Sequence, residues 1–134
     1  MDNFTQRPHI LVVEDHNVFR RFLLSWLSRS YEVTAVSNGF DALSWLQEGN
    51  QTDLVLLDME MPRIDGPSFL RNIRCSGIHQ HLPVVALTSR TEEEVASCCE
   101  GLDLEYVFRK PYRPEALLSA IGASLGHIGR LQAA

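Results

Sequence analysis

The sequence predicts an α/β fold, (βα)₅, in which a doubly wound parallel sheet of five strands is covered by helices on both faces. Five short apolar runs alternate with five stretches whose apolar residues recur at helical spacing. The third run, residues 53–57, is apolar on both of its faces, as expected for a central strand covered from two sides. Because alternating strands and helices build parallel sheets with right-handed crossovers, one domain of this type accounts for most of the 134 residues.

The strands are predicted in the five apolar runs, at residues 9–13, 32–36, 53–57, 82–87 and 106–108. Pro83 fits only near the start of the fourth strand, because proline has no N–H to donate to a neighbouring strand. Pro62 and the Asp65-Gly66-Pro67 run require a loop between the third strand and the helix that follows it.

The first helix is expected from about Asn17 to Arg29, where apolar residues at spacings of three and four form one stripe. We interpret that stripe as a core-facing surface, made of Val18, Phe19, Phe22, Leu23, Trp26 and Leu27. The second helix is expected to begin near Asn38-Gly39, with Ala42, Leu43 and Leu46 facing inward.

The last three helices are predicted from their terminal residues or their apolar faces. The third presents Phe69, Leu70 and Ile73. Thr91 and Glu94 form the pattern of a capping box, which predicts a fourth helix through about Cys99. Pro114 suits the first turn of a last helix, whose inward face is made of Leu117, Leu118, Ile121 and Leu125.

Composition narrows the class of protein. The net charge is −5 and no Lys/Arg run occurs, so a nucleic-acid-binding surface is not expected. No apolar stretch approaches the roughly 20 residues of a membrane span, and the polar start of the chain is unlike a signal peptide. Three cysteines, two of them adjacent, argue for a reducing compartment, so we expect a cytoplasmic protein. A redox switch at Cys98-Cys99 competes there with the ordinary role of free cysteines as small core residues.

Polar residues follow four of the five predicted strands, at the edge where open parallel sheets place their functional sites. They are Glu14, Asp15, Asp58, Thr88 and Lys110. Singly, each has an ordinary explanation as a helix cap, a strand end or a surface charge. Together, three carboxylates at one edge would repel one another, and a hard cation such as Mg²⁺ would relieve that repulsion. A carboxylate could then attack phosphorus while the metal and Lys110 neutralise the phosphoryl oxygens.

These segments resemble the receiver domain of two-component response regulators. The resemblance lies in residues 10–15, 56–66, 84–89 and 109–112, with an Asp-x-x-Met-Pro-x-x-Asp-Gly pattern that is specific to the family. It covers residues 9–126 as a receiver domain, between an N-terminal extension at residues 1–8 and a C-terminal tail at 127–134. It implies the flavodoxin-like strand order 2-1-3-4-5, which is the order known for a chemotaxis member of this family.

The resemblance also implies a role for each site residue. Asp58 would be the phosphoacceptor, Thr88 the switch hydroxyl, and Lys110 the cation that contacts the phosphoryl group. Glu14, Asp15, Asp58 and the backbone carbonyl of Glu60 would organise Mg²⁺. The Lys110-Pro111 peptide is expected to be cis. Such a chain is a signalling phosphoacceptor and not an enzyme, since it catalyses only its own phosphorylation and dephosphorylation.

Three further positions modulate this scheme. Glu60 and Arg90 stand where family members tune phosphoryl loss, and we predict an ion pair between them that hinders the attacking water. Val107 occupies a position that is often Tyr or Phe in the family. The aromatic half of the switch is therefore either absent or supplied by Tyr106 through a bulge.

The expected partners are a histidine kinase or a histidine phosphotransfer protein, and a downstream protein that the sequence does not identify. The donor is expected to dock beside the first helix, where Arg20 and Arg21 are exposed candidates for contact. Residues 91–108 hold six acidic residues and no Lys or Arg. This composition argues against a family dimer that uses basic residues of the fourth helix, and favours a partner with a basic patch; other homodimers are left open. The short tail suggests that no effector domain is present in this chain, which is either a stand-alone receiver or a piece of a larger regulator or hybrid kinase.

Three other functions are weighed. A flavin carrier of the same topology needs a glycine- and hydroxyl-rich phosphate loop, where this chain has Glu14-Asp15-His16. A Mg²⁺-dependent hydrolase with an aspartyl-phosphate intermediate needs a second acid beside the nucleophile, and only Glu60 is near in sequence. A degenerate receiver that serves as a phosphorylation-independent interaction module would not need the intact acidic, hydroxyl and lysine set.

Overall fold

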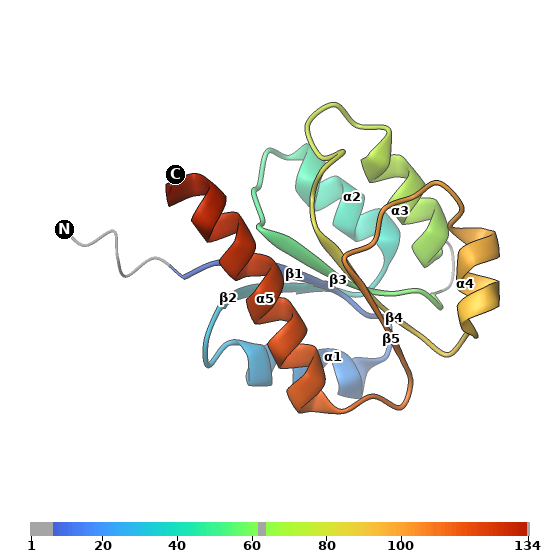
Figure 1. Cartoon of the computed structure of the whole chain (residues 1–134), viewed down its shortest axis with the longest axis horizontal. Helices are drawn as coiled ribbons and strands as arrows, with labels where there is room; N and C mark the ends of the chain where they lie inside the picture. The colour runs from blue at the N-terminus through green and yellow to red at the C-terminus, as the bar shows by residue number, and fades with distance from the viewer. Residues whose placement is uncertain (1–6, 62–63, 134) are drawn as a thin grey trace.

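The computed structural model describes residues 7–61 and 64–133, with side chains described as far as residue 126 (Figure 1). Strands and helices alternate along the whole described chain. In order they are β1 (His9–Val13), α1 (Asn17–Leu27), β2 (Glu32–Val36), α2 (Gly39–Gln47), β3 (Leu54–Asp58), α3 (Gly66–Arg74), β4 (Val84–Thr88), α4 (Glu92–Cys98), β5 (Tyr106–Arg109) and α5 (Pro114–Ala133).

The five strands form one parallel sheet in the order β2-β1-β3-β4-β5, which confirms the predicted fold class and strand order. Helices α1 and α5 cover one face, and α2, α3 and α4 cover the other (Figure 1). Each face has its own core: Phe69 and Leu70 pack with Val55 and Leu57 on one side, and Leu23 and Leu117 pack with Leu56 on the other. Every residue of β3 and β4 is buried, as expected of central strands.

Two predicted strands begin and end later than expected, and the shift makes Asp58 and Thr88 the last residues of β3 and β4. Asp53 lies before β3 because its carboxylate accepts a hydrogen bond from the backbone N–H of His9 at 2.8 Å. Pro83 lies before β4, where its carbonyl accepts from the N–H of Val55 at 2.9 Å. The two polar residues therefore belong to the rigid sheet rather than to the loops after it.

The apolar stripe on α1 was interpreted wrongly. Only Leu23 and Leu27 are buried, whereas Val18, Phe19 and Phe22 are 66%, 57% and 48% exposed. Trp26 is half-buried and packs against the core of that face. Residues four apart place Leu23 and Leu27 toward the sheet, while the first two turns face a space that α5 does not fill. Helix α1 also ends at Leu27 rather than near Arg29.

The last helix differs from its prediction in two ways. It continues to Ala133, past the expected boundary near residue 126, because no proline follows Pro114 to interrupt the helix. Leu118 is 37% exposed and does not belong to the buried face, which is made of Leu117, Ile121 and Leu125. Residues 1–6 of the predicted N-terminal extension, and Pro62, lie outside the described residues.

The Asp65-Gly66 pair explains how the chain returns from the end of β3 into α3. Asp65 caps α3 by accepting from the N–H of Ser68 at 2.9 Å. Gly66 donates its N–H to the Met59 carbonyl at 3.2 Å, and a Cβ at Gly66 would lie 2.5 Å from the Met59 Cα. Only glycine allows this close approach. The contact fixes the backbone directly after Asp58.

No helix within the described residues is long and apolar enough to span a membrane.

Candidate functional site

The carboxyl ends of β1, β3, β4 and β5 bring all of the predicted strand-end residues to one edge of the sheet. Glu14 and Asp15 follow β1, Asp58 ends β3, Thr88 ends β4, and Lys110 follows β5. Glu14, Asp58 and Thr88 are buried, at 4%, 2% and 0% exposure. Polar side chains this well buried need partners, and the site provides them.

Glu14, Asp15 and Asp58 form an acidic cluster in which one carboxylate oxygen from each lies within 4.8 Å of the others. Glu14 also accepts a hydrogen bond from the backbone N–H of His16 at 3.1 Å. Burial, followed by the charge of Asp58, raises the pKa of Glu14 to about 7. Burial also raises the pKa of Asp58, although Lys110 acts in the opposite direction.

This cluster fits a hard divalent cation. Carboxylate oxygens are the ligands that such ions prefer, and a bound cation would offset both the burial and the mutual repulsion that raise the two pKa values. The three carboxylates Glu14, Asp15 and Asp58 are therefore able to hold a metal ion. The predicted contribution of the Glu60 carbonyl stays a prediction.

Lys110 contacts Asp58 from the other side. Its Nζ lies 2.8 Å from Asp58 Oδ1, and the same oxygen accepts from the backbone N–H of Glu60 at 3.1 Å. The Lys110-Pro111 peptide is cis, as expected from the resemblance. The backbone N–H of Lys110 donates to the Thr88 carbonyl at 2.7 Å, which joins the start of the β5–α5 loop to the end of β4. The phosphoacceptor candidate and the lysine are therefore in direct contact.

The Glu60 carboxylate makes contacts that the sequence did not reveal. It accepts from Thr88 Oγ1 at 2.5 Å, and from the backbone N–H and Oγ of Ser89 at 2.8 and 3.1 Å. Its predicted ion pair with Arg90 is present, with 3.8 Å between Nε and Oε2. Burial opposes the shift, but the hydrogen bonds from Thr88 and Ser89 lower the pKa of Glu60. No sequence signal distinguished Ser89 as a partner, because its contact depends on where the Glu60 side chain lies.

The Val107 region supports the first of the two sequence alternatives. The register between β4 and β5 runs unbroken from Val85–Tyr106 to Thr88–Arg109, with Val107 opposite Ala86. Tyr106 therefore keeps its place on the same face as Phe108, with ring centroids 6.4 Å apart. Val107 is 43% exposed and occupies the position of the family aromatic.

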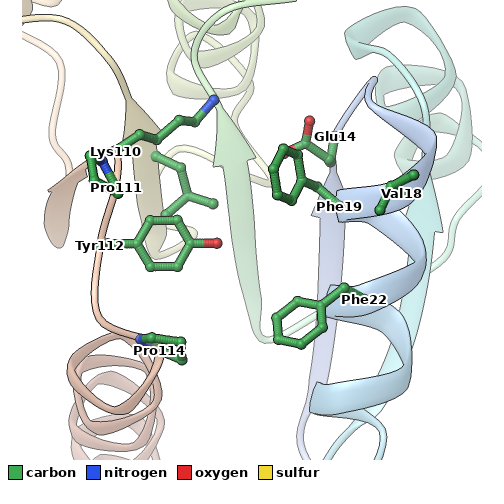
Figure 2. Close-up of a pocket in the computed structure, with 9 residues that line it drawn as sticks. Glu14, Val18, Phe19, Phe22, Lys110, Pro111, Tyr112 and Pro114 are labelled. Carbon is green, nitrogen blue, oxygen red and sulfur yellow. The ribbon is translucent and has the colours of Figure 1, made fainter.

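A largely apolar pocket of about 600 Å³ opens beside this site, between α1 and the loop that joins β5 to α5 (Figure 2). Phe19 and Phe22 of α1 face Tyr112 and Pro114 across it, while Lys110 extends to the end of β3 (Figure 2). Glu14 and Lys110 line both the pocket and the acidic site. The sequence does not reveal the pocket, because Phe19 and Phe22 fit the helical spacing of core residues.

Arg20 was expected to be exposed, but it is half-buried and holds the loop after β1. Its guanidinium donates to the backbone carbonyls of Glu14 and Asp15 at 3.1 and 3.2 Å. Arg21 is exposed as expected. Arg20 therefore shapes the acidic loop, and Arg21 remains the candidate for contact with a partner.

Comparisons with known proteins agree on one family. The family model of the response regulator receiver domain matches residues 10–122. The response regulator MprA of Mycobacterium sp. (strain KMS) is 39% identical over 119 residues, which cover 87% of this chain and 50% of that protein. The chain spans about half of the length of this relative and as little as 10% of other curated relatives.

Solved structures share the fold. The signal receiver domain of a signal transduction histidine kinase from Syntrophus aciditrophicus has a TM-score of 0.84 at 25% identity, covering 92% of this chain and 93% of that one. The receiver domain of the sensor histidine kinase PA1611 from Pseudomonas aeruginosa PAO1 has a TM-score of 0.79 at 28% identity, covering 91% and 99%. That structure holds a magnesium ion coordinated in its active-site cleft.

Proposed function

This chain belongs to the response regulator receiver family of two-component signalling, and on that basis we propose that Asp58 accepts a phosphoryl group from a phosphohistidine donor. The observation that carries the proposal is the position of Asp58. It is 2% exposed, its Oδ1 contacts Lys110 Nζ at 2.8 Å, and two further carboxylates lie within reach of one shared cation. A carboxylate oxygen of Asp58 attacks phosphorus, the bond to the donor imidazole breaks, and Lys110 neutralises the transferred oxygens.

We further propose that Mg²⁺ is the metal of the acidic cluster. Glu14, Asp15 and Asp58 would hold it with the Glu60 carbonyl, and the magnesium in the PA1611 receiver domain supports this choice. When bound, Mg²⁺ supplies positive charge to the phosphoryl oxygens and screens them from the carboxylates. Glu14 and Asp15 would orient the cation, while the Lys110 ammonium beside Asp58 favours the ionised form of that carboxylate.

Thr88 connects phosphorylation to a change of surface. Its hydroxyl donates to Glu60 Oε2 and accepts the backbone N–H of Arg90 at 3.0 Å. Phosphoryl oxygens on Asp58 would compete with Glu60 for this hydroxyl. A shift of Thr88 would pull on Ser89 and Arg90, which lead directly into α4. With Val107 in place of an aromatic residue, this half of the switch acts without an aromatic rotation.

We propose that the phosphohistidine donor docks at the apolar pocket beside the site. A helix that carries the phosphohistidine would insert an apolar side chain between Phe19, Phe22 and Tyr112, which brings its imidazole over Asp58. Arg21 would contact the flank of the same helix. A histidine kinase or a histidine phosphotransfer domain is the class of partner that fits, and the chain itself catalyses only its own phosphorylation and dephosphorylation.

The test is the intact mass of the protein after treatment with acetyl phosphate and Mg²⁺. The wild type should gain one phosphoryl group, and Asp58→Asn should gain none. Asp103→Asn, which changes an exposed carboxylate away from the cluster, should behave as the wild type. No gain in the wild type at saturating donor would favour the degenerate receiver. Repeated turnover of a small phosphate ester would favour the hydrolase.

A further inference from the structure

Two cysteine sulfurs lie close together at the end of α4. Cys98 is the last residue of the helix and is half-buried, and Cys99 is its C-cap and is buried. Their Sγ atoms are 3.6 Å apart. The third cysteine, Cys75, is exposed at the end of α3 and serves as an internal comparison.

Arg90 connects this pair to the phosphoacceptor site. One guanidinium nitrogen of Arg90, Nη1, donates to Cys98 Sγ at 3.0 Å, and its Nε lies 3.8 Å from Glu60 Oε2. The backbone N–H of Arg90 donates to Thr88 Oγ1 at 3.0 Å. A single residue therefore contacts the Cys98 sulfur, the Glu60 carboxylate and the switch hydroxyl.

We propose that Cys98 is a redox modification site, which a peroxide oxidises to a sulfenic acid and Cys99 then closes into a disulfide. In the first step the Cys98 sulfur attacks one oxygen of a peroxide ROOH, an S–O bond forms, the O–O bond breaks, and ROH leaves with the proton. In the second, the Cys99 thiol attacks Cys98 Sγ, an S–S bond forms, the S–O bond breaks, and water leaves. The peroxide is the two-electron oxidant for the pair.

The surroundings assign different roles to the two cysteines. A guanidinium beside a sulfur stabilises the negative charge that the attacking form carries, and Arg90 provides one for Cys98. Cys98 is also the more accessible of the two. Burial raises the pKa of the Cys99 thiol to about 11, so Cys99 is a poor first nucleophile toward a peroxide. Cys98 therefore reacts first.

The helix end permits the disulfide to form. Cys99 has φ −118° and ψ 24°, which lie outside the helical conformation, so the peptide that joins the two cysteines can adjust without opening the body of α4. The local cost is the hydrogen bond from the Cys99 N–H to the Val95 carbonyl, now 2.9 Å. A disulfide between adjacent residues spans less than the usual Cα separation, which makes it easily reduced and hence suited to regulation.

Disulfide formation draws the Cys98 sulfur toward Cys99 and weakens its contact with the Arg90 guanidinium, which then holds its place beside Glu60 less firmly. This consequence rests on the proposed function of Asp58, because the Glu60–Arg90 pair is expected to hinder the water that attacks the aspartyl phosphate. The oxidised protein should therefore lose its phosphoryl group about twofold to fivefold faster than the reduced protein.

The experiment treats the full chain with a small excess of hydrogen peroxide and follows peptide masses, with dimedone present to trap sulfenic acids. The wild type should lose two hydrogens between Cys98 and Cys99, and dithiothreitol should restore them. Cys99→Ser should yield a dimedone adduct on Cys98, and Cys98→Ser should yield neither product. Arg90→Gln should slow the oxidation of Cys98 about fivefold, while Cys75→Ser, the matched control, should oxidise as the wild type does.

The phosphoryl lifetime is then measured in the reduced and oxidised forms of the wild type and of Cys98→Ser. A difference in the wild type that Cys98→Ser lacks supports the coupling. Oxidation at Cys75 with Cys98 intact overturns the assignment of the site, and equal lifetimes after disulfide formation overturn the coupling. Failure of the reduced protein to take up a phosphoryl group contradicts the proposed function instead. The peptide masses measure the oxidation of Cys98 separately.

Discussion

The Glu60 carboxylate holds the Thr88 hydroxyl, with 2.5 Å between Oε2 and Oγ1. In this arrangement the hydroxyl points its proton at Glu60, so a phosphoryl group on Asp58 has to displace a charge-assisted hydrogen bond before it gains Thr88. The same carboxylate pairs with Arg90 and lies 3.7 Å from Lys110 Nζ. Under the proposed function, Glu60 would compete with the phosphoryl group for Thr88, and its pair with Arg90 would hinder the attacking water.

Replacing Glu60 with alanine should shorten the lifetime of the aspartyl phosphate by about threefold to tenfold, because the pair with Arg90 no longer hinders water. The rate is measured as loss of the phosphoryl mass after the donor is removed. Glu48→Ala, which changes the exposed C-cap residue of α2, is the control. An unchanged lifetime in Glu60→Ala would refute the protective role of the pair.

Replacing Glu14 with glutamine should stabilise the metal-free protein near neutral pH. Burial and Asp58 raise the pKa of Glu14 from 4.5 to about 7, so between these values the unfolded chain has lost the proton that the folded chain keeps. The free energy of unfolding of the wild type therefore falls as pH rises through this window. Glu14→Gln has no carboxyl group to titrate there, so its free energy of unfolding does not show this fall. The expected gain at pH 7.5 is roughly 1–3 kcal/mol, with little difference at pH 4.5.

Urea unfolding at the two pH values measures this effect, and Glu48→Gln is the matched variant on an exposed site. Added Mg²⁺ should reverse the ranking at pH 7.5, because the ion binds the ionised Glu14 cluster of the wild type. Equal pH slopes for the wild type and Glu14→Gln would mean that Glu14 ionises in the folded protein as it does in the unfolded chain.

Gly66→Ala should destabilise the domain by about 1–3 kcal/mol, the usual cost of forcing a methyl group into a packed site. The new Cβ would lie 2.5 Å from Met59 Cα and 2.7 Å from Met59 Sδ, so the backbone after Asp58 has to move. Acetyl phosphate should then label Asp58 more slowly as well. Thermal unfolding measures the loss of stability. At Gly77 nothing lies within 4 Å of the place that a methyl group would take, so Gly77→Ala should be close to neutral in that assay.

The resemblance to receiver domains predicted the strand order, which the sheet confirms. The alternation of strands and helices predicted that Glu14, Asp15, Asp58, Thr88 and Lys110 meet at one edge, because each of them lies at the end of a parallel strand. The capping box of Thr91 and Glu94 was also confirmed, since it depends on local spacing alone. The meeting of these side chains and the capping box follow from short-range pattern and from the geometry of parallel sheets.

The sequence did not predict the contacts that depend on the direction of a side chain. Phe19 and Phe22 follow the spacing of a core stripe, but whether they are covered depends on where the β5–α5 loop lies. The hydrogen bonds from Thr88 and Ser89 to the Glu60 carboxylate depend on one rotamer of Glu60. They join residues that are 28 and 29 positions apart in the sequence. Helical period identifies an apolar face, and only tertiary packing determines how much of that face is buried.

A variant of Phe22 can test docking of the donor separately from the chemistry at Asp58. Phe22 is 48% exposed and lines the pocket, so Phe22→Ala should fold normally yet lose apolar contact with a phosphohistidine donor. With a donor domain that phosphorylates the wild type, kcat/KM for transfer should fall about tenfold or more, the cost of an aromatic anchor. Labelling by acetyl phosphate should be unchanged, because this small donor does not need the pocket. Ile78→Ala, which truncates an 86% exposed residue outside the pocket, is the matched control. Equal loss with both donors would show that Phe22 supports the site itself, and no loss with either would place docking elsewhere.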